Sequence, residues 1–133
     1  GKVLQVVRSY NANNSYLSTT STSLVASGLT VAITPTKAGN TVLIDFSTPM
    51  SDCGTTVMTA VMYQNGSAMA GAGAYQLSYL NKQYVPISFG GKFVAVDTSP
   101  ITFEVYFRSS GGSLVYLLHA SSSYQMTATE ILG

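Results

Sequence analysis

The chain has few of the residues that usually hold a protein together by charge or by covalent links. Charged residues make up 8% of its 133 residues, against about 25% in an average soluble domain. One cysteine excludes a disulfide within the chain, and the absence of tryptophan argues against the Cys–Trp–Cys core of an immunoglobulin domain. Apolar packing must therefore supply most of the stability.

The small charge also narrows the range of partners. The net charge is +1, with the basic residues dispersed along the chain, so no nucleic-acid-binding surface is predicted. No apolar run approaches the ~20 residues of a membrane-spanning helix, so we expect no membrane insertion. The chain begins at Gly1 without an initiator methionine. We therefore expect one domain over residues 1–133 that is a processed product or an excised piece of a longer protein.

Groups able to perform acid–base or metal chemistry are scarce. His119 is the only histidine, and a single imidazole without neighbouring ligands does not make a metal site, although three copies could meet on a threefold axis. No Gly-x-Ser-x-Gly motif is present. A glycosidase would need two of the five carboxylates to face a sugar cleft; they are Asp45, Asp52, Asp97, Glu104 and Glu130. We predict no enzyme, no cofactor and no metal, with a polysaccharide depolymerase as the enzymatic alternative.

Alternation of apolar and polar residues is the strongest positive signal. In residues 41–47, Val42, Ile44 and Phe46 share one face, and residues 101–108 alternate in the same way. The expected strands are 2–8, 29–34, 41–47, 55–64, 67–69, 83–89, 92–96, 101–108, 114–120 and 124–132. Eight to ten short strands predict an all-β, antiparallel, jelly-roll-like sandwich.

Turn residues predict how these strands connect. Asn65-Gly66 is suited to a two-residue hairpin turn. Residues 35–40, with a proline and a glycine, predict a hairpin between strands 29–34 and 41–47. Gly90-Gly91 predicts a second tight hairpin between strands 83–89 and 92–96, and Pro86 favours an edge strand.

Two predicted strands, 55–64 and 114–120, are apolar on both faces. A second apolar face must be covered by another layer or by another chain, and the low charge favours another chain. We therefore predict an oligomer. The residues expected at the subunit interface are Met58, Met62, Val115, Leu117 and His119. The alternative is that loops of the same chain cover the outer face.

Several segments, taken in order and spacing, resemble one family. They are residues 1–7, 27–35, 37–46, 99–106, 108–112 and 127–132. Together they resemble the C-terminal receptor-binding domains at the tail-fibre tips of tailed phages, particularly phages of aquatic bacteria. The resemblance implies a homotrimeric β-sandwich on the virion, at the distal end of an extracellular fibre, that binds a glycan or outer-membrane component of the host without catalysis. Alternatives are a virion structural or decoration protein and a secreted trimeric lectin-like domain akin to C1q or tumour necrosis factor.

Tyrosines with neighbouring amides are the candidate receptor contacts, because a flat ring and paired donors and acceptors suit sugars and mixed polar surfaces. The first cluster is Tyr75, Gln76, Tyr79, Asn81, Lys82, Gln83 and Tyr84; the second is Tyr10, Asn11, Asn13, Asn14 and Tyr16. Tyrosine is also a common strand residue, so the alternative is that these rings pack at sheet margins.

Overall fold

The computed structural model describes residues 1–11, 16–69, 75–78, 85–119 and 123–133, and within them the fold is all-β. Eleven strands occur in these residues. They are β1 (Val3–Asn11), β2 (Leu17–Thr19), β3 (Val25–Ile33), β4 (Thr41–Ser51), β5 (Val57–Gln64), β6 (Ser67–Ala68), β7 (Tyr75–Ser78), β8 (Val85–Val94), β9 (Ile101–Ser109), β10 (Val115–Leu118) and β11 (Tyr124–Ile131).

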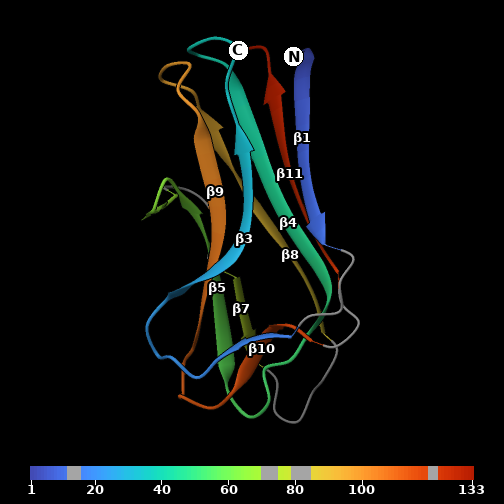
Figure 1. Ribbon diagram of the computed structural model, residues 1–133, viewed down its shortest axis with the longest axis vertical. Helices are drawn as coiled ribbons and strands as arrows, with labels where there is room; N and C mark the ends of the chain where they lie inside the picture. Colours follow the sequence, from blue (N-terminus) through green and yellow to red (C-terminus); the bar gives the residue numbers. More distant parts are fainter. Residues whose placement is uncertain (12–15, 70–74, 79–84, 120–122) are drawn as a thin grey trace.

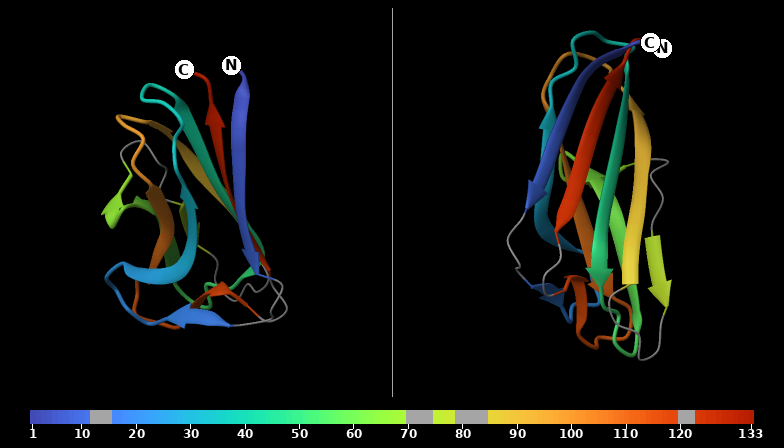
Figure 2. Two further views of the ribbon diagram at one scale, coloured as in Figure 1. Left: turned by 45° about the horizontal axis from the view of Figure 1, so that its top comes forward. Right: turned by 90° about the vertical axis from the view of Figure 1, so that its right-hand side faces the viewer.

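The strands form two main antiparallel sheets packed face to face (Figures 1 and 2). The first sheet has the order β1-β11-β4-β8, and the second has β3-β9-β5, with β6 and β7 both paired to β5. The short pair β2–β10 lies across the end of the sandwich that is opposite the two termini. The predicted jelly-roll-like sandwich is confirmed.

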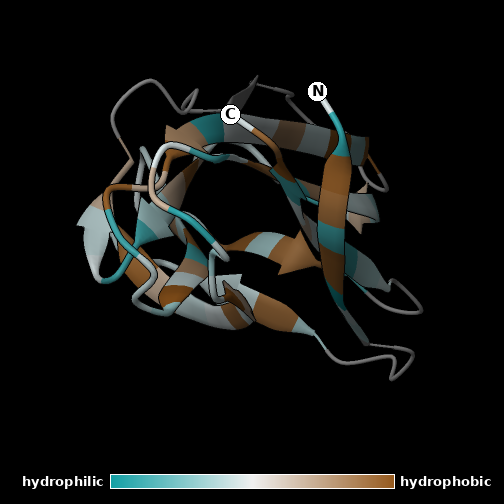
Figure 3. Ribbon diagram, turned by 90° about the horizontal axis from the view of Figure 1, so that it is seen from above, coloured by the Kyte–Doolittle hydropathy of each residue, from teal (hydrophilic) through white to brown (hydrophobic). Residues whose placement is uncertain are grey.

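The core lies between the sheets, where the predicted alternation holds. Val42, Ile44 and Phe46 of β4 are buried, as are Phe103 and Val105 of β9. Figure 3, viewed from the end that carries the termini, shows the two layers with hydrophobic and hydrophilic bands alternating along their strands. Each fully buried side chain of this size contributes about 1.5–3 kcal/mol.

The predicted interface residues of β5 and β10 face the core, whereas Val57, Val61 and Tyr63 on the opposite face of β5 are only partly buried. Met58, Met62, Val115 and Leu117 are each at most 1% exposed and belong to the core. A side chain without accessible surface cannot contact a partner subunit. The structure therefore corrects the prediction that these four residues form a subunit interface: Met58 and Met62 lie on the core-facing side of β5, and β10 packs inward across the end of the sandwich.

Two predicted hairpins are also wrong. Strands β3 and β4 belong to different sheets, so residues 35–40 cross between the layers instead of closing a hairpin. Strand β8 runs through Gly90 and Gly91 without turning. A Cβ at Gly90 would lie within 2.2 Å of the Ile44 carbonyl oxygen, so this glycine permits close approach of β4 and β8.

Other local predictions are confirmed. Asn65 and Gly66 adopt positive φ values of 49° and 84° in the tight turn between β5 and β6, as a two-residue hairpin requires. Pro86 lies on the edge strand β8, where its missing N–H costs no ladder hydrogen bond.

Both termini lie at one end of the sandwich (Figure 2), and a buried carboxylate joins three segments there. Glu130 Oε1 accepts hydrogen bonds from the Thr36 N–H, Thr36 Oγ1 and Asn40 Nδ2 at 2.7–2.9 Å, and Oε2 accepts one from Gln5 Nε2 at 2.6 Å. Burial acts to raise the pKa of Glu130, but these hydrogen bonds outweigh it and lower the pKa to about 2. Glu130 therefore ties β1, β11 and the 35–40 crossing together as an anion.

No helix in the described part of the chain is long and apolar enough to cross a membrane.

Candidate functional site

The outer face of the first sheet carries two adjacent rows of polar side chains. Antiparallel register aligns Tyr10, Gln125, Ser47 and Ser88 across β1, β11, β4 and β8. The neighbouring row on the same face is Arg8, Thr127, Asp45 and Gly90. Four strands thus contribute to one surface, which we call the polar platform and define by Arg8, Tyr10, Asp45, Ser47, Ser88 and Gln125.

Local contacts orient the charged members of the platform. The Arg8 guanidinium lies 5.1 Å from the centroid of the Tyr10 ring, a cation–π arrangement that fixes both side chains. Partial burial raises the pKa of Asp45. Gly90, the cross-strand partner of Asp45, has no side chain, so no group projects from the sheet beside Asp45 on β8.

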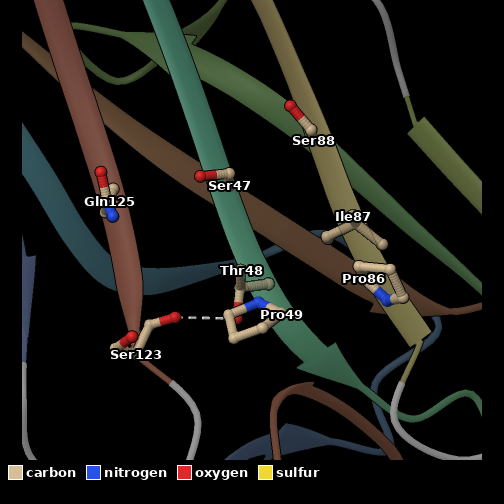
Figure 4. Close-up of a pocket in the computed structure, with 8 residues that line it drawn as sticks. All are labelled: Ser47, Thr48, Pro49, Pro86, Ile87, Ser88, Ser123 and Gln125. Atoms are coloured by element: carbon tan, nitrogen blue, oxygen red, sulfur yellow. Dashed lines mark hydrogen bonds between the residues drawn. The ribbon is translucent and has the colours of Figure 1, made fainter.

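A hollow of about 620 Å³ opens at the end of the platform farther from the termini (Figure 4). The residues that line it are Ser47, Thr48, Pro49, Pro86, Ile87, Ser88, Ser123 and Gln125. Thr48 Oγ1 donates a hydrogen bond to the Ser123 carbonyl at 3.2 Å, which ties the end of β4 to the start of β11. Pro49 on β4 and Pro86 on β8 restrict the backbone of two of the strands that line the hollow.

The hollow suits binding better than acid–base chemistry. Serine hydroxyls and the Gln125 amide offer both donors and acceptors, and none of the residues that line the hollow is ionisable. Its volume falls within the range of small-molecule sites, about 300–1,000 Å³. The arrangement fits a polar ligand without charge.

Most other carboxylates in the described residues hold local structure. Asp52 Oδ1 accepts the Gly54 N–H at 2.8 Å and Asp97 Oδ1 accepts the Ser99 N–H at 2.8 Å, while Glu104 Oε2 accepts the Gly28 N–H at 2.9 Å. Burial, with a smaller contribution from the Asp52 charge, raises the pKa of Cys53 to about 11, so this thiol stays protonated and unreactive at neutral pH. No group of three or more His, Cys, Asp or Glu side chains in the described residues could hold a metal ion.

The first predicted receptor cluster is only partly described by the structure. Tyr75 and Gln76 lie on β7, at the margin of the second sheet, where they pair with Ala60 and Thr59 of β5. The rest of that cluster, Tyr79, Asn81, Lys82, Gln83 and Tyr84, lies outside the described residues. Its role stays a prediction.

The second predicted cluster is divided between two surfaces. Tyr10 is 64% exposed on the polar platform, whereas Tyr16 is 59% exposed beside Tyr116, at the end formed by β2 and β10. Asn11 ends β1, and Asn13 and Asn14 lie outside the described residues.

Sequence analysis missed Gln125 and Ser88 as platform residues. Alternation shows that each points outward from its own strand, but their proximity depends on β11 pairing with β4, and β4 with β8. These pairings join segments far apart in the chain. No short-range sequence signal specifies them.

Comparisons with known proteins identify the fold and no family. No protein-family model matches the chain, and no curated protein matches it. Among solved structures, the chain is similar to the C-terminal domain of EclA, described as a sugar-binding protein, with a TM-score of 0.51 and 11% identity over 89% of this chain and 79% of that one. It also matches the VP2 subviral particle of infectious bursal disease virus, with a TM-score of 0.46 and 16% identity, over 94% of this chain and about a third (32%) of that one.

Proposed function

We propose that this protein is the receptor-binding tip domain of a phage tail fibre and that it binds a glycan of the bacterial surface. The observation that carries the proposal is the hollow at the end of the polar platform, where hydroxyl and amide groups from three strands converge. Neutral donors and acceptors of this kind complement the hydroxyl groups of a sugar.

The neighbouring platform extends the surface available to a glycan. Tyr10 lies in the same cross-strand row as Gln125, Ser47 and Ser88, and an exposed tyrosine ring supplies apolar area together with a hydroxyl group. The similarity to a domain described as sugar-binding supports the same ligand class at the level of fold.

The position of the termini supports the proposed orientation. Both ends of the chain lie at one end of the sandwich (Figures 1 and 2). The hollow is lined by the parts of β4, β8 and β11 at the other end. A fibre shaft joined to Gly1 would therefore enter at the terminal end. The hollow would then face away from the virion, toward the host.

The proposed assembly is a homotrimer, for which the terminal half of the first sheet offers a surface. Its outer face exposes four apolar side chains, Val3, Val6, Leu43 and Val94, which we call the apolar strip. Thr129 lies between Val6 and Leu43 in the same cross-strand row, and Lys92 lies beside Leu43 at the sheet edge. With a net charge of only +1, three copies would repel one another little. In this proposal the apolar strip is the subunit interface, in place of the four residues that the structure buries in the core.

We propose binding without hydrolysis and without a cofactor. Glycoside hydrolysis requires two carboxyl groups about 5–10 Å apart on either side of the bond. The hollow is lined by hydroxyl, amide and apolar groups, which can orient a sugar but cannot donate and accept the proton.

The proposal is tested by filling the hollow. Ser88→Tyr on β8 would place a ring in it, and Thr102→Tyr on the exposed face of β9 adds the same ring elsewhere. On an array of bacterial surface polysaccharides, we expect Ser88→Tyr to weaken binding by at least about tenfold, or about 1.4 kcal/mol.

The Thr102→Tyr control should bind as the parent protein does.

Competition for phage adsorption by the isolated domain then separates a receptor-binding tip from a virion structural protein. A parent chain that binds no polysaccharide on the array and does not block adsorption would contradict the proposal.

A further inference from the structure

Three aromatic rings meet at the end of the sandwich opposite the termini. Tyr16 lies 5.1 Å from His119 and 5.5 Å from Tyr116, measured between ring centroids, and Tyr116 lies 4.8 Å from His119. Both tyrosines meet the imidazole edge to face, at 79° and 82°. The rings contact one another, so no ligand can enter between them.

The two inner rings are held firmly by the backbone. Tyr116 and Asp52 exchange backbone hydrogen bonds at 2.7 and 3.0 Å, and the His119 N–H donates to the Met50 carbonyl at 3.0 Å. His119 Nε2 also lies 3.9 Å from Asp52 Oδ2. These contacts fasten β10 to the end of β4.

Tyr16 is the exposed member of this group, which we call the end cluster and define by Tyr16, Tyr116, His119 and Asp52. More than half of Tyr16 is accessible, whereas the side chains of His119 and Asp52 are only 13% and 9% exposed. Tyr116 and His119 therefore pack against the inner side of the Tyr16 ring, and its outer surface stays accessible to solvent. A supported, exposed ring loses little conformational entropy when a ligand stacks on it.

We propose that the open surface of Tyr16 is a second subsite that stacks against one pyranose ring of the receptor glycan. This inference rests on the proposed function and assigns a separate part of the ligand to the end cluster. The negative face of an aromatic ring attracts C–H groups, and one face of a pyranose presents such groups while its hydroxyl groups remain in water.

The hollow and the end cluster are connected through the end of β4. Thr48 and Pro49 line the hollow, and the next residue, Met50, accepts the hydrogen bond from His119. The end of β4 and the β2–β10 pair lie opposite the termini (Figures 1 and 2), so both subsites belong to that half of the molecule. An oligosaccharide long enough to span both subsites would gain affinity without requiring either subsite to bind tightly alone.

The test compares three variants with the parent protein on the same polysaccharide array. Tyr16→Ala removes the ring, Tyr16→Phe keeps the ring without its hydroxyl group, and Leu114→Ala trims another exposed apolar residue at the same end. We expect Tyr16→Ala to lower affinity roughly three- to tenfold, while Tyr16→Phe and Leu114→Ala bind as the parent does. Thermal unfolding of each variant shows whether the fold is kept.

The outcomes separate this inference from the proposed function. If Tyr16→Ala binds as the parent does while Ser88→Tyr has lost binding, the stacking subsite is wrong and the hollow stands. If Tyr16→Phe loses as much affinity as Tyr16→Ala, the hydroxyl group and not the ring is the contact, which also overturns stacking. A parent chain that binds no polysaccharide overturns both.

Discussion

The two ends of this sandwich use their polar groups in opposite ways. At the terminal end, Glu130 is fully buried and accepts four hydrogen bonds that join β1, β11 and the 35–40 crossing. At the other end, serine, glutamine and tyrosine side chains surround an open hollow and an exposed ring. If the proposed function holds, the same chain separates stability from recognition along its long axis, and the contrast predicts where substitutions affect folding and where they affect binding.

The largest effect on folding is expected from Glu130→Gln. The substitution keeps the size of the side chain but removes its charge and turns one acceptor oxygen into a donor that faces Gln5. Hydrogen bonds to a charged group contribute about 1.5–3 kcal/mol each, so the free energy of unfolding should fall by at least about that amount. Chemical denaturation measures it.

The matched control is Glu104→Gln on the half-exposed face of β9, which should lower stability less. Equal losses in the two variants would contradict a special role for the terminal end.

Acid should remove the contribution of Glu130 selectively. The pKa of this carboxyl is about 2 in the folded protein and 4.5 ordinarily, so its stabilisation is complete above the ordinary pKa and is lost as the pH falls from about 5 to 2. The difference in thermal midpoint between the parent and Glu130→Gln should shrink over this range. A difference that is constant with pH would mean that the charge is not the stabilising feature.

A smaller effect on folding, but a large one on assembly, is expected on the apolar strip. Val6 is 58% exposed on the terminal half of the first sheet, so Val6→Lys should leave the fold intact while placing a charge in the proposed trimer contact. Analytical ultracentrifugation should show trimers for the parent and smaller species for the variant. Ser88→Lys, on the other half of the same face, is the control that should remain trimeric; a monomeric parent would refute the proposed assembly.

Sequence patterns predicted the parts of the fold that depend on neighbours in the chain. Alternation at Val42, Ile44 and Phe46 identified a buried strand face, and Asn65-Gly66 identified a turn, because each signal is local. The 35–40 segment was mistaken for a hairpin loop because its turn residues serve equally well in a crossing between sheets. In the folded protein this crossing is held by Glu130, about ninety residues away in the chain.

The candidate site was less predictable for the same reason. The sequence names Tyr10 and Tyr16 as candidate receptor contacts, yet their neighbours depend on strand pairing: Gln125 lies beside Tyr10, and Tyr116 beside Tyr16. Gly90-Gly91 predicted a turn because glycine pairs usually do, whereas here Gly90 permits two strands to approach closely. Positions of side chains from sequence-distant strands need the sheet order, which no pattern in the chain supplies.

The most direct test of the contrast between the two ends is a paired measurement of polysaccharide affinity and unfolding free energy for Ser88→Tyr and Glu130→Gln. We predict that Ser88→Tyr loses glycan affinity at parental stability, and that Glu130→Gln loses stability while its folded fraction keeps parental affinity. Parental affinity for Ser88→Tyr, in a protein that otherwise binds the glycan, would contradict the assignment of recognition to the hollow.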